Sequence, residues 1–450
     1  MSVDAATDGP RADAPVAPSA CTPACGAGDV CVAGACVAAI ANPCGPATGY
    51  APNSPWPTIT GCETNQRRTF AIGPAAMPAV VWRWNPTVGI NQAMIWGPVI
   101  DGTGALYVVS EYDVTRLAPD GSEVWRRRIV ASTDQVAGAG PAVLLADGDV
   151  LVCVASQPEI QKRRAATGDL VWTTTGAYCG GNGSLIDDSG ITVPAVAPDG
   201  TISNAGLTMS PVTGALGPVP PRGCVGTPVI DGAGIAYCMA DGQLVALRPD
   251  GTQAWSSNLD GFHRMFGHVM LTSYQGQPVV TIPVQNGVVT PNQWIALYPT
   301  AGPGTTANDP SVPHLSGMTF FGPAAVAPDR DLVFLNRGTG ATAGVERWGQ
   351  DQIGAATPVA RWISATPRGG ARSPHPAPVI DGNGDIYYGS YDGYLISLDP
   401  AGAERWRVRI GLADGVGNLG TPAIAADGTI YIVGHATGGA ASYLYALRAP

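Results

Sequence analysis

Residues 226–259, GTPVIDGAGIAYCMADGQLVALRPDGTQAWSSNL, decide the fold. The runs TPVID, IAYCMA, QLVALRP and TQAWSSNL have the composition of short strands, and an Asp-Gly pair lies in each turn between them. Asp-Gly between hydrophobic runs is a strong hairpin signal, because Gly accepts the positive φ that such turns need. The stretch therefore predicts an antiparallel meander of four strands that ends with Trp255. One such meander cannot bury both faces of its sheet, so it requires similar neighbours.

The same pattern recurs along the chain, at intervals typical of propellers and other repeat arrays. Further copies begin at Trp96, Gly140, Val193, His268, Gly322, Pro376 and Thr421, which makes eight in all. The copies at Val193 and His268 fit loosely, and Trp362 stands where the closing Trp of the Gly322 copy belongs.

The last copy ends at Pro450 after its third strand, and an unpaired strand, MPAVVWRW, precedes the first copy. Pairing these two segments would remove two exposed sheet edges at once. We therefore predict that residues 79–84 complete the sheet that contains residues 443–448. A linear solenoid would not need this strand.

Length and composition exclude several classes of protein. The 450 residues suffice for one large domain and an appendage, and Gly and Pro punctuate strands instead of forming low-complexity runs. A net charge of −10 without basic clusters argues against a nucleic-acid partner. Because no apolar run is long enough to span a membrane, we expect no transmembrane segment.

The N-terminal region divides into two parts. Residues 1–20 lack periodicity and are expected to form a flexible tether without a visible signal peptide. Residues 21–70 hold six cysteines in a Gly/Pro-rich segment too short to bury a core: Cys21, Cys25, Cys31, Cys36, Cys44 and Cys62. Without a CxxC pair or a nearby His, disulfides are favoured over a zinc module.

Disulfides persist only in oxidising compartments, so we expect an extracytoplasmic protein, either periplasmic, attached to the outer membrane or secreted. A leader or lipid anchor upstream of Met1 would then have been removed or left out of the sequence. Four cysteines lie in the repeats. Cys179 and Cys224 each precede the first strand of neighbouring copies and could meet as a disulfide, whereas Cys153 and Cys238 lie within strands as small buried hydrophobes.

The endings LVALRPDGTQAW, RRAATGDLVW and SLDPAGAERW resemble the PQQ-like repeat of eight-bladed propellers, over about residues 77–450. The resemblance implies an all-β fold of four-stranded antiparallel blades, in which a Trp near the end of each blade docks onto the next blade. The superfamily contains quinoprotein dehydrogenases, the outer-membrane assembly lipoprotein of the BamB type and secreted binding proteins. The fold therefore does not choose the function.

The residues favour the non-enzymatic branch. Quinoprotein alcohol dehydrogenases carry a vicinal Cys-Cys pair and a calcium site, but this sequence has no Cys-Cys pair and no segment that maps onto the calcium ligands. Asp381-Gly-Asn383-Gly-Asp385 resembles the start of a calcium loop, but sister copies lack its ligands and no Glu follows at the required offset. We expect no cofactor and no metal. PQQ with calcium remains the alternative, as does a polysaccharide-acting site in the central funnel.

The longer insertions and all five His residues map to one face, which carries the blade-to-blade connections and the turns between second and third strands. Long loops on a rigid scaffold are where binding residues gather. The predicted ligand-binding residues are Arg222, His263, Arg264, His268, His314, Arg368, Arg372, His375 and His435. We interpret the chain as a monomeric, exported eight-bladed β-propeller, closed by its N-terminal strand and preceded by a Cys-rich segment. Through this loop-rich face it would bind a protein or glycan partner, in a role such as envelope assembly.

Overall fold

The structure is a computed structural model. It describes residues 29–32, 35–38, 49–86, 97–110, 112–129, 140–154, 159–176, 193–204, 206–217, 224–240, 243–258, 262–265, 268–286, 293–300, 314–318, 320–336, 344–353, 355, 358–364, 377–390, 392–437 and 441–450.

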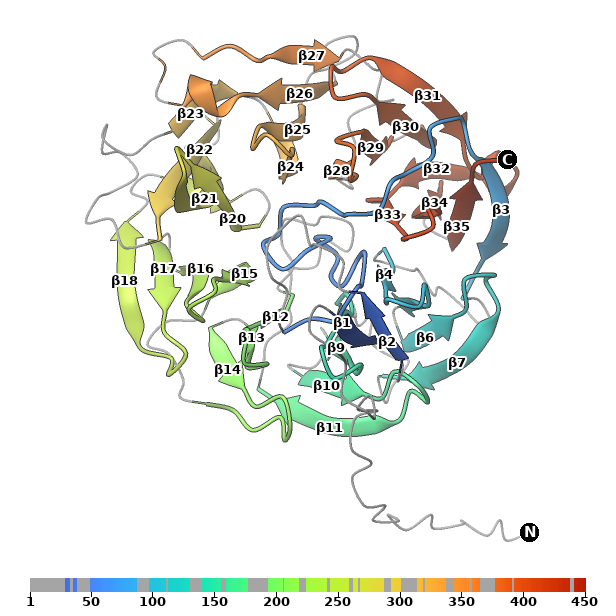
Figure 1. Cartoon of the computed structure of the whole chain (residues 1–450), viewed down its shortest axis with the longest axis horizontal. Coiled ribbons are helices and arrows are strands. Elements are labelled where there is room, and N and C mark those ends of the chain that lie inside the picture. The colour runs from blue at the N-terminus through green and yellow to red at the C-terminus, as the bar shows by residue number, and fades with distance from the viewer. Residues whose placement is uncertain are drawn as a thin grey trace, which may run out of the picture.

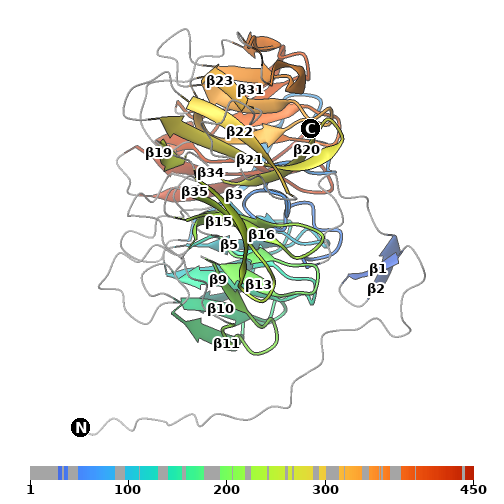
Figure 2. The same ribbon diagram turned by 90° about the vertical axis from the view of Figure 1, so that its left-hand side faces the viewer.

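The described residues form eight antiparallel sheets and one separate hairpin, and they contain no α-helix. The hairpin pairs β1 (Asp29–Val32) with β2 (Ala35–Ala38) and lies apart from the sheets (Figure 2). Two short 3-10 turns occur, η3 (Gln350–Gln352) and η4 (Leu412–Asp414).

The first three sheets follow the chain. The first contains β4 (Val99–Ile100), β5 (Leu106–Val109), β6 (Asp113–Leu117) and β7 (Glu123–Arg128). The second contains β8 (Val143–Leu144), β9 (Val150–Val154), β10 (Glu159–Arg163) and β11 (Leu170–Thr175). The third, from the loosely fitting copy at Val193, has three strands, β12 (Ala195–Val196), β13 (Ile202–Asn204) and β14 (Leu207–Met209).

The fourth and fifth sheets come from the middle of the chain. The fourth is the predicted four-stranded meander, which contains β15 (Val225–Ile230), β16 (Ala236–Ala240), β17 (Gln243–Leu247) and β18 (Gln253–Asn258). The fifth has five strands, β19 (Phe262–Met265), β20 (Met270–Tyr274), β21 (Gln277–Asn286), β22 (Gln293–Pro299) and β23 (His314–Met318).

The last three sheets complete the set. The sixth contains β24 (Phe320–Val326), β25 (Leu332–Asn336), β26 (Val345–Trp348) and β27 (Trp362–Ser364). The seventh contains β28 (Val379–Ile380), β29 (Ile386–Gly389), β30 (Tyr394–Leu398) and β31 (Glu404–Arg409). The eighth contains β3 (Ala79–Trp84), β32 (Val416–Leu419), β33 (Ala423–Ile424), β34 (Ile430–Ala436) and β35 (Ser442–Arg448).

Figure 1 shows these sheets side by side around a common centre, as in a β-propeller. The predicted pairing of residues 79–84 with residues 443–448 is confirmed: β3 runs antiparallel to β35, with Ala79 opposite Arg448 and Trp84 opposite Leu444. The first strand of the repeat region therefore shares a sheet with the last.

In three sheets an Asp side chain holds the turn after the innermost strand in the same way. Asp231 Oδ1 accepts the backbone N–H groups of Ala233 and Ile235, each at 2.9 Å, and its Oδ2 accepts the Tyr237 hydroxyl at 2.8 Å. Asp101 and Asp381 make the same bonds in their own sheets. In this turn the second glycine, Gly234, takes the positive φ, at +81°.

The regular spacing of the repeat also places a Trp side chain against the neighbouring sheet, as the resemblance implied. In five sheets the indole N–H donates to a turn carbonyl of the next sheet at 2.9–3.2 Å: Trp82 to Pro119, Trp125 to Ala165, Trp172 to Pro211, Trp255 to Thr300 and Trp362 to Pro400. Trp82 belongs to the eighth sheet and docks on the first, so the two ends of the array are neighbours.

The docked indole rings lie against glycine residues, so a matched pair of Gly→Ala variants can test the docking. A Cβ on Gly402 (φ +86°) would lie 2.6 Å from the Trp362 ring, whereas a Cβ on Gly148 (φ +82°) meets nothing within 4 Å. Both Gly→Ala changes carry the left-handed backbone cost of about 1 kcal/mol. We expect Gly402→Ala to lose about 1–3 kcal/mol more than Gly148→Ala in denaturant unfolding, because its methyl group displaces the indole. Equal losses would contradict the docking.

Candidate functional site

The centre of the ring holds a segment of the chain itself. Residues 49–74, the blue trace at the middle of Figure 1, lie where the first strands of the sheets converge. They are among the most buried residues of the protein: the side chain of Trp56 is 1% exposed and that of Arg67 is fully buried. The expectation that residues 21–70 contribute to no core is therefore wrong for residues 49–70, and we call residues 49–74 the central segment.

The central segment is bound to the sheets through its backbone. It exchanges hydrogen bonds of 2.8–3.1 Å with the first strands of five sheets, at or next to Ile100, Leu144, Leu271, Val326 and Ile380. Ile100 N–H, for example, donates to the Trp56 carbonyl at 2.8 Å, and Ile380 N–H donates to the Arg67 carbonyl at 3.0 Å. Unpaired inner strand edges are thereby satisfied by this segment.

Side chains extend the attachment to the third and fourth sheets. The Tyr50 hydroxyl accepts the Val196 N–H at 3.0 Å, and Asn65 Nδ2 donates to the Pro228 carbonyl at 3.4 Å. Trp406 Nε1 donates to the carbonyl of Pro74 at 3.0 Å. The other docking indoles donate to a turn of the next sheet, whereas Trp406 donates to the central segment. Periodicity could not reveal this segment, because it contains no regular strand; its one visible signal is the large apolar Trp56 in a Gly/Pro-rich stretch.

Two ionisable side chains are buried beside each other at the central segment. Arg67 and His268 are both buried at this position, with exposures of 0% and 1%. Burial, and next the positive charge of Arg67, lowers the pKa of His268 well below its usual value.

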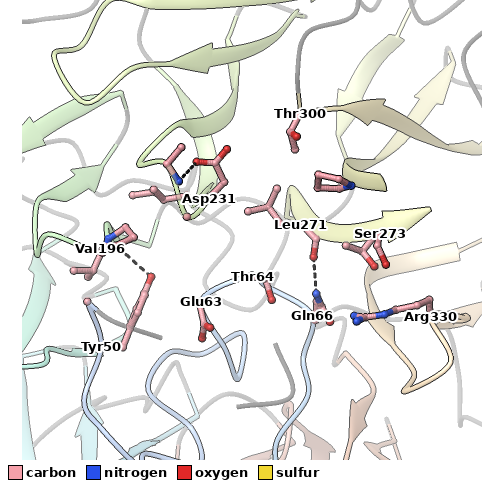
Figure 3. Close-up of a pocket in the computed structure, with 17 residues that line it drawn as sticks. Tyr50, Glu63, Thr64, Gln66, Val196, Asp231, Leu271, Ser273, Thr300 and Arg330 are labelled. Atoms are coloured by element: carbon pink, nitrogen blue, oxygen red, sulfur yellow. Dashed lines mark hydrogen bonds between the residues drawn. The ribbon is translucent and has the colours of Figure 1, made fainter. Parts of the chain in front are cut away.

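A cavity of about 430 Å³ opens between the central segment and the turns of the neighbouring sheets (Figure 3). Tyr50, Glu63 and Gln66 line it from the central segment, and Asp231, Leu271 and Arg330 line it from three sheets. Its size lies within the range of small-molecule sites. We treat this cavity as the candidate functional site and call it the central pocket.

Two buried polar atoms that line the central pocket lack partners among the described residues. The Gln66 side chain is 2% exposed, and its Nε2 donates to the Leu271 carbonyl at 2.6 Å, which fixes the amide so that Oε1 remains unbonded. Thr272 is 8% exposed, and its hydroxyl is likewise unbonded. Buried polar atoms are almost always hydrogen-bonded, so these two are suited to a bound molecule.

Arg330 brings a positive charge to the same cavity. Figure 3 shows its side chain extending toward Gln66. The acids on either side of it are engaged elsewhere, Asp329 with Arg347, and Asp331 with Arg347 and Arg361. Burial, and next the charge of Arg330, lowers the pKa of the nearby Arg68 guanidinium to about 10.

The structure tests the predicted binding residues only in part. Arg222, Arg368, Arg372 and His375 lie outside the described residues. The backbones of His263 and Arg264 in β19 and of His314 in β23 belong to the two edge strands of the fifth sheet, but their side chains are not described. Their role in binding stays a prediction.

The two described histidines do not extend from loops. His268 is buried against the central segment, as noted above. His435 lies within β34 and not in the turn predicted for it, and its Nδ1 is 2.8 Å from the Ser442 hydroxyl oxygen. Burial lowers the pKa of His435 to about 4. Both side chains were expected on an accessible face, but His268 is buried and His435 is half-buried within a strand, where its ring contacts Ser442.

The described cysteines form disulfides, and the one pair suggested from the sequence, Cys179 with Cys224, is not among them. Cys36 and Cys62 are disulfide-bonded, as predicted for the Cys-rich segment, while the side chains of Cys21, Cys25, Cys31 and Cys44 lie outside the described residues, as does Cys179. Cys224 is bonded to Cys238 (Cα–Cα 5.7 Å) and not to Cys179. Cys153 and Cys238 are buried within strands, as predicted, but both are disulfide-bonded, so they are not simple hydrophobic side chains.

Asp381 serves its turn and not a cation. Its carboxylate accepts N–H groups from Gly73, Asn383 and Asp385 and the hydroxyl of Tyr387, at 2.9–3.1 Å. Asp385 pairs with Arg405. Within the described ranges, no three His, Cys, Asp or Glu side chains gather as they would around a metal ion. The same ranges contain no helix with the length and apolar composition needed to cross a bilayer.

Several solved structures share this fold. The chain matches the quinohemoprotein alcohol dehydrogenase of Comamonas testosteroni with a TM-score of 0.60 and 15% identity, over 88% of this chain and 82% of that one. It matches a quinohemoprotein alcohol dehydrogenase of Pseudomonas putida HK5 with a TM-score of 0.60 and 14% identity, over 87% and 80%. It matches BamB from Moraxella catarrhalis with a TM-score of 0.52 and 15% identity, over 83% and 98%.

The suspected PQQ-like β-propeller fold is thus confirmed. At these identities the likeness concerns the fold and not the activity. No protein-family model matches the sequence, and no curated protein matches it.

Proposed function

We propose that the protein is a non-catalytic binding scaffold: an eight-bladed propeller closed by β3, with its centre held by its own central segment. The eight sheets supply the blades, and the Trp82 contact with the first sheet supports closure. The scaffold works outside the cytoplasm, where disulfides such as Cys224–Cys238 persist.

The single observation that carries this proposal is the backbone pairing of the central segment with the first strands of five sheets. A propeller enzyme that uses its funnel needs that space for cofactor or substrate. Here the space holds Trp56, Arg67 and His268, all less than 2% exposed. The quinohemoprotein dehydrogenases share the fold at 14–15% identity, a likeness that concerns the fold alone, so the buried centre of this chain is what supports a non-catalytic role.

The partner of the scaffold is a protein or a glycan, bound on the face that carries the blade-to-blade connections. Long connections on a rigid framework are suited to such recognition, because they vary without disturbing the sheets. The candidate contacts on this face remain those predicted from the sequence, with His268 and His435 in structural roles.

The test is a titration of the purified full chain with PQQ and Ca²⁺, followed by thermal unfolding and by reduction of an artificial electron acceptor with an alcohol present. A ligand that binds only the folded state raises the melting temperature by mass action. We expect neither a PQQ-dependent shift nor dye reduction. A calcium-dependent shift with dye reduction, or turnover of an acidic polysaccharide in a parallel assay, would make the protein an enzyme.

A further inference from the structure

We propose that the central pocket binds a small zwitterion, an amino acid or short peptide, with its carboxylate on Arg330 and its N–H groups toward Gln66. This site lies at the central segment and does not depend on the loop-rich face assigned above. It goes beyond the proposed scaffold role, because it gives the protein a small-molecule ligand in addition to a macromolecular partner.

The first support is the identity of residue 330. The equivalent turns of three other sheets place Gly148, Gly200 and Gly428 at this position, with φ of +82°, +86° and +81°. Arg330 adopts the same conformation with φ of +74°. A side chain in this region is strained, and a glycine would relieve the strain. An arginine held there against that cost points to a function for its side chain.

The second support is a pair of buried polar atoms near Arg330 that have no hydrogen-bond partner among the described residues. Gln66 Oε1 accepts hydrogen bonds only, and its amide is locked by the bond from Nε2 to the Leu271 carbonyl. Oε1 has almost no exposed surface in the pocket, so a small displacement of the amide on binding would let it accept an amine or peptide N–H of the ligand. The Thr272 hydroxyl, which can donate or accept, is the other buried polar group without a partner among the described residues that line the pocket.

Charge and shape narrow the class of ligand. Arg330 presents a fork of N–H donors that suits a carboxylate, and Glu63 adds negative charge to the pocket near Tyr50 and Thr64 (Figure 3). A ligand with both charges satisfies this arrangement better than a simple anion would. The volume of about 430 Å³ accommodates an amino acid or a short peptide, with Leu271 and Val196 available to an apolar side chain.

The experiment uses the full chain and a panel of the twenty L-amino acids and the twenty Ala-Xaa dipeptides, screened by thermal shift. The best probe is then measured by calorimetry, and so is the same compound with its carboxylate amidated. We expect at least one zwitterion to bind and the amidated form to bind at least tenfold more weakly. Preference for a free amino acid or for a dipeptide then distinguishes the two sources of this chemistry.

Arg330→Gly separates binding from folding, because it restores the glycine of the sister turns. We expect this variant to melt at the same or a higher temperature than the parent and to bind the probe at least tenfold more weakly. Arg248→Gln is the matched control for lost charge, since Arg248 is exposed and does not line the central pocket. Absence of binding across the panel, or equal binding by the amidated probe or by Arg330→Gly, would overturn the proposal.

Discussion

Trp56→Ala is expected to lower the free energy of unfolding by about 3–5 kcal/mol, the usual loss for a large aromatic residue removed from a core. Trp56 is 1% exposed, and it packs in the cluster that contains Ile100, Leu106 and Ile424. Its carbonyl also accepts the Ile100 N–H at 2.8 Å. Truncation leaves a cavity at the point where the central segment meets the first and eighth sheets. Equilibrium denaturation measures the effect.

Ile72→Ala in the same segment is the control, because the Ile72 side chain is 53% exposed. We expect it to change stability by no more than about 0.5 kcal/mol. If the central segment were a loosely attached leader, both variants would unfold like the parent protein. Equal and small effects of the two substitutions would therefore contradict the packing described above.

The double variant Cys224→Ala/Cys238→Ala is expected to lose about 3 kcal/mol of stability under oxidising conditions. The two cysteines are 14 residues apart, and closing a loop of about 15 residues removes that much conformational freedom from the unfolded chain. The bridge joins the residue before β15 to the middle of β16, so the native sheet should survive its loss.

Chemical reduction provides the control for the disulfide. Parent and double variant are unfolded in parallel with and without a thiol reductant. The gap between them should be present in the oxidised samples and shrink once the parent is reduced. A gap that persists after reduction would assign the effect to lost side-chain packing, and no gap in either state would show that the bridge contributes nothing to stability.

Much of the fold could be predicted because its turns and its Trp docking contacts are local in sequence and recur along the chain. Asp231, Tyr237 and Trp255 recur at fixed offsets in sister copies, and the same offsets place the same turn bonds and docking contacts. The pairing of β3 with β35 could be predicted because the last copy lacks its fourth strand and an extra strand precedes the first copy. Such inferences need only the period of the sequence and the requirement that sheet edges be satisfied.

The centre could not be predicted, since it depends on contacts that leave no periodic trace. Arg67, which is fully buried, lies in a stretch whose backbone follows no regular strand, and its φ of +53° is set by the sheets around it. The partner of Cys224 depends on how β15 pairs with β16, where the register shifts. Arg330 was visible in the sequence as an Arg at a turn position where sister copies have Gly. A role in binding could be inferred only after the structure showed that it lines the central pocket.

Hydrogen exchange over residues 49–74 tests the central claim most directly. The N–H groups of Gly61, Asn65, Arg67 and Thr69 are hydrogen-bonded at 2.9–3.1 Å in the interior of the ring. The structure predicts that peptides from this segment are protected as strongly as those from β20 and β28, because they open only when the sheets around them do. Exchange at the rate of an unstructured peptide, with the sheets still protected, would show that the centre of the ring is open and would contradict the account.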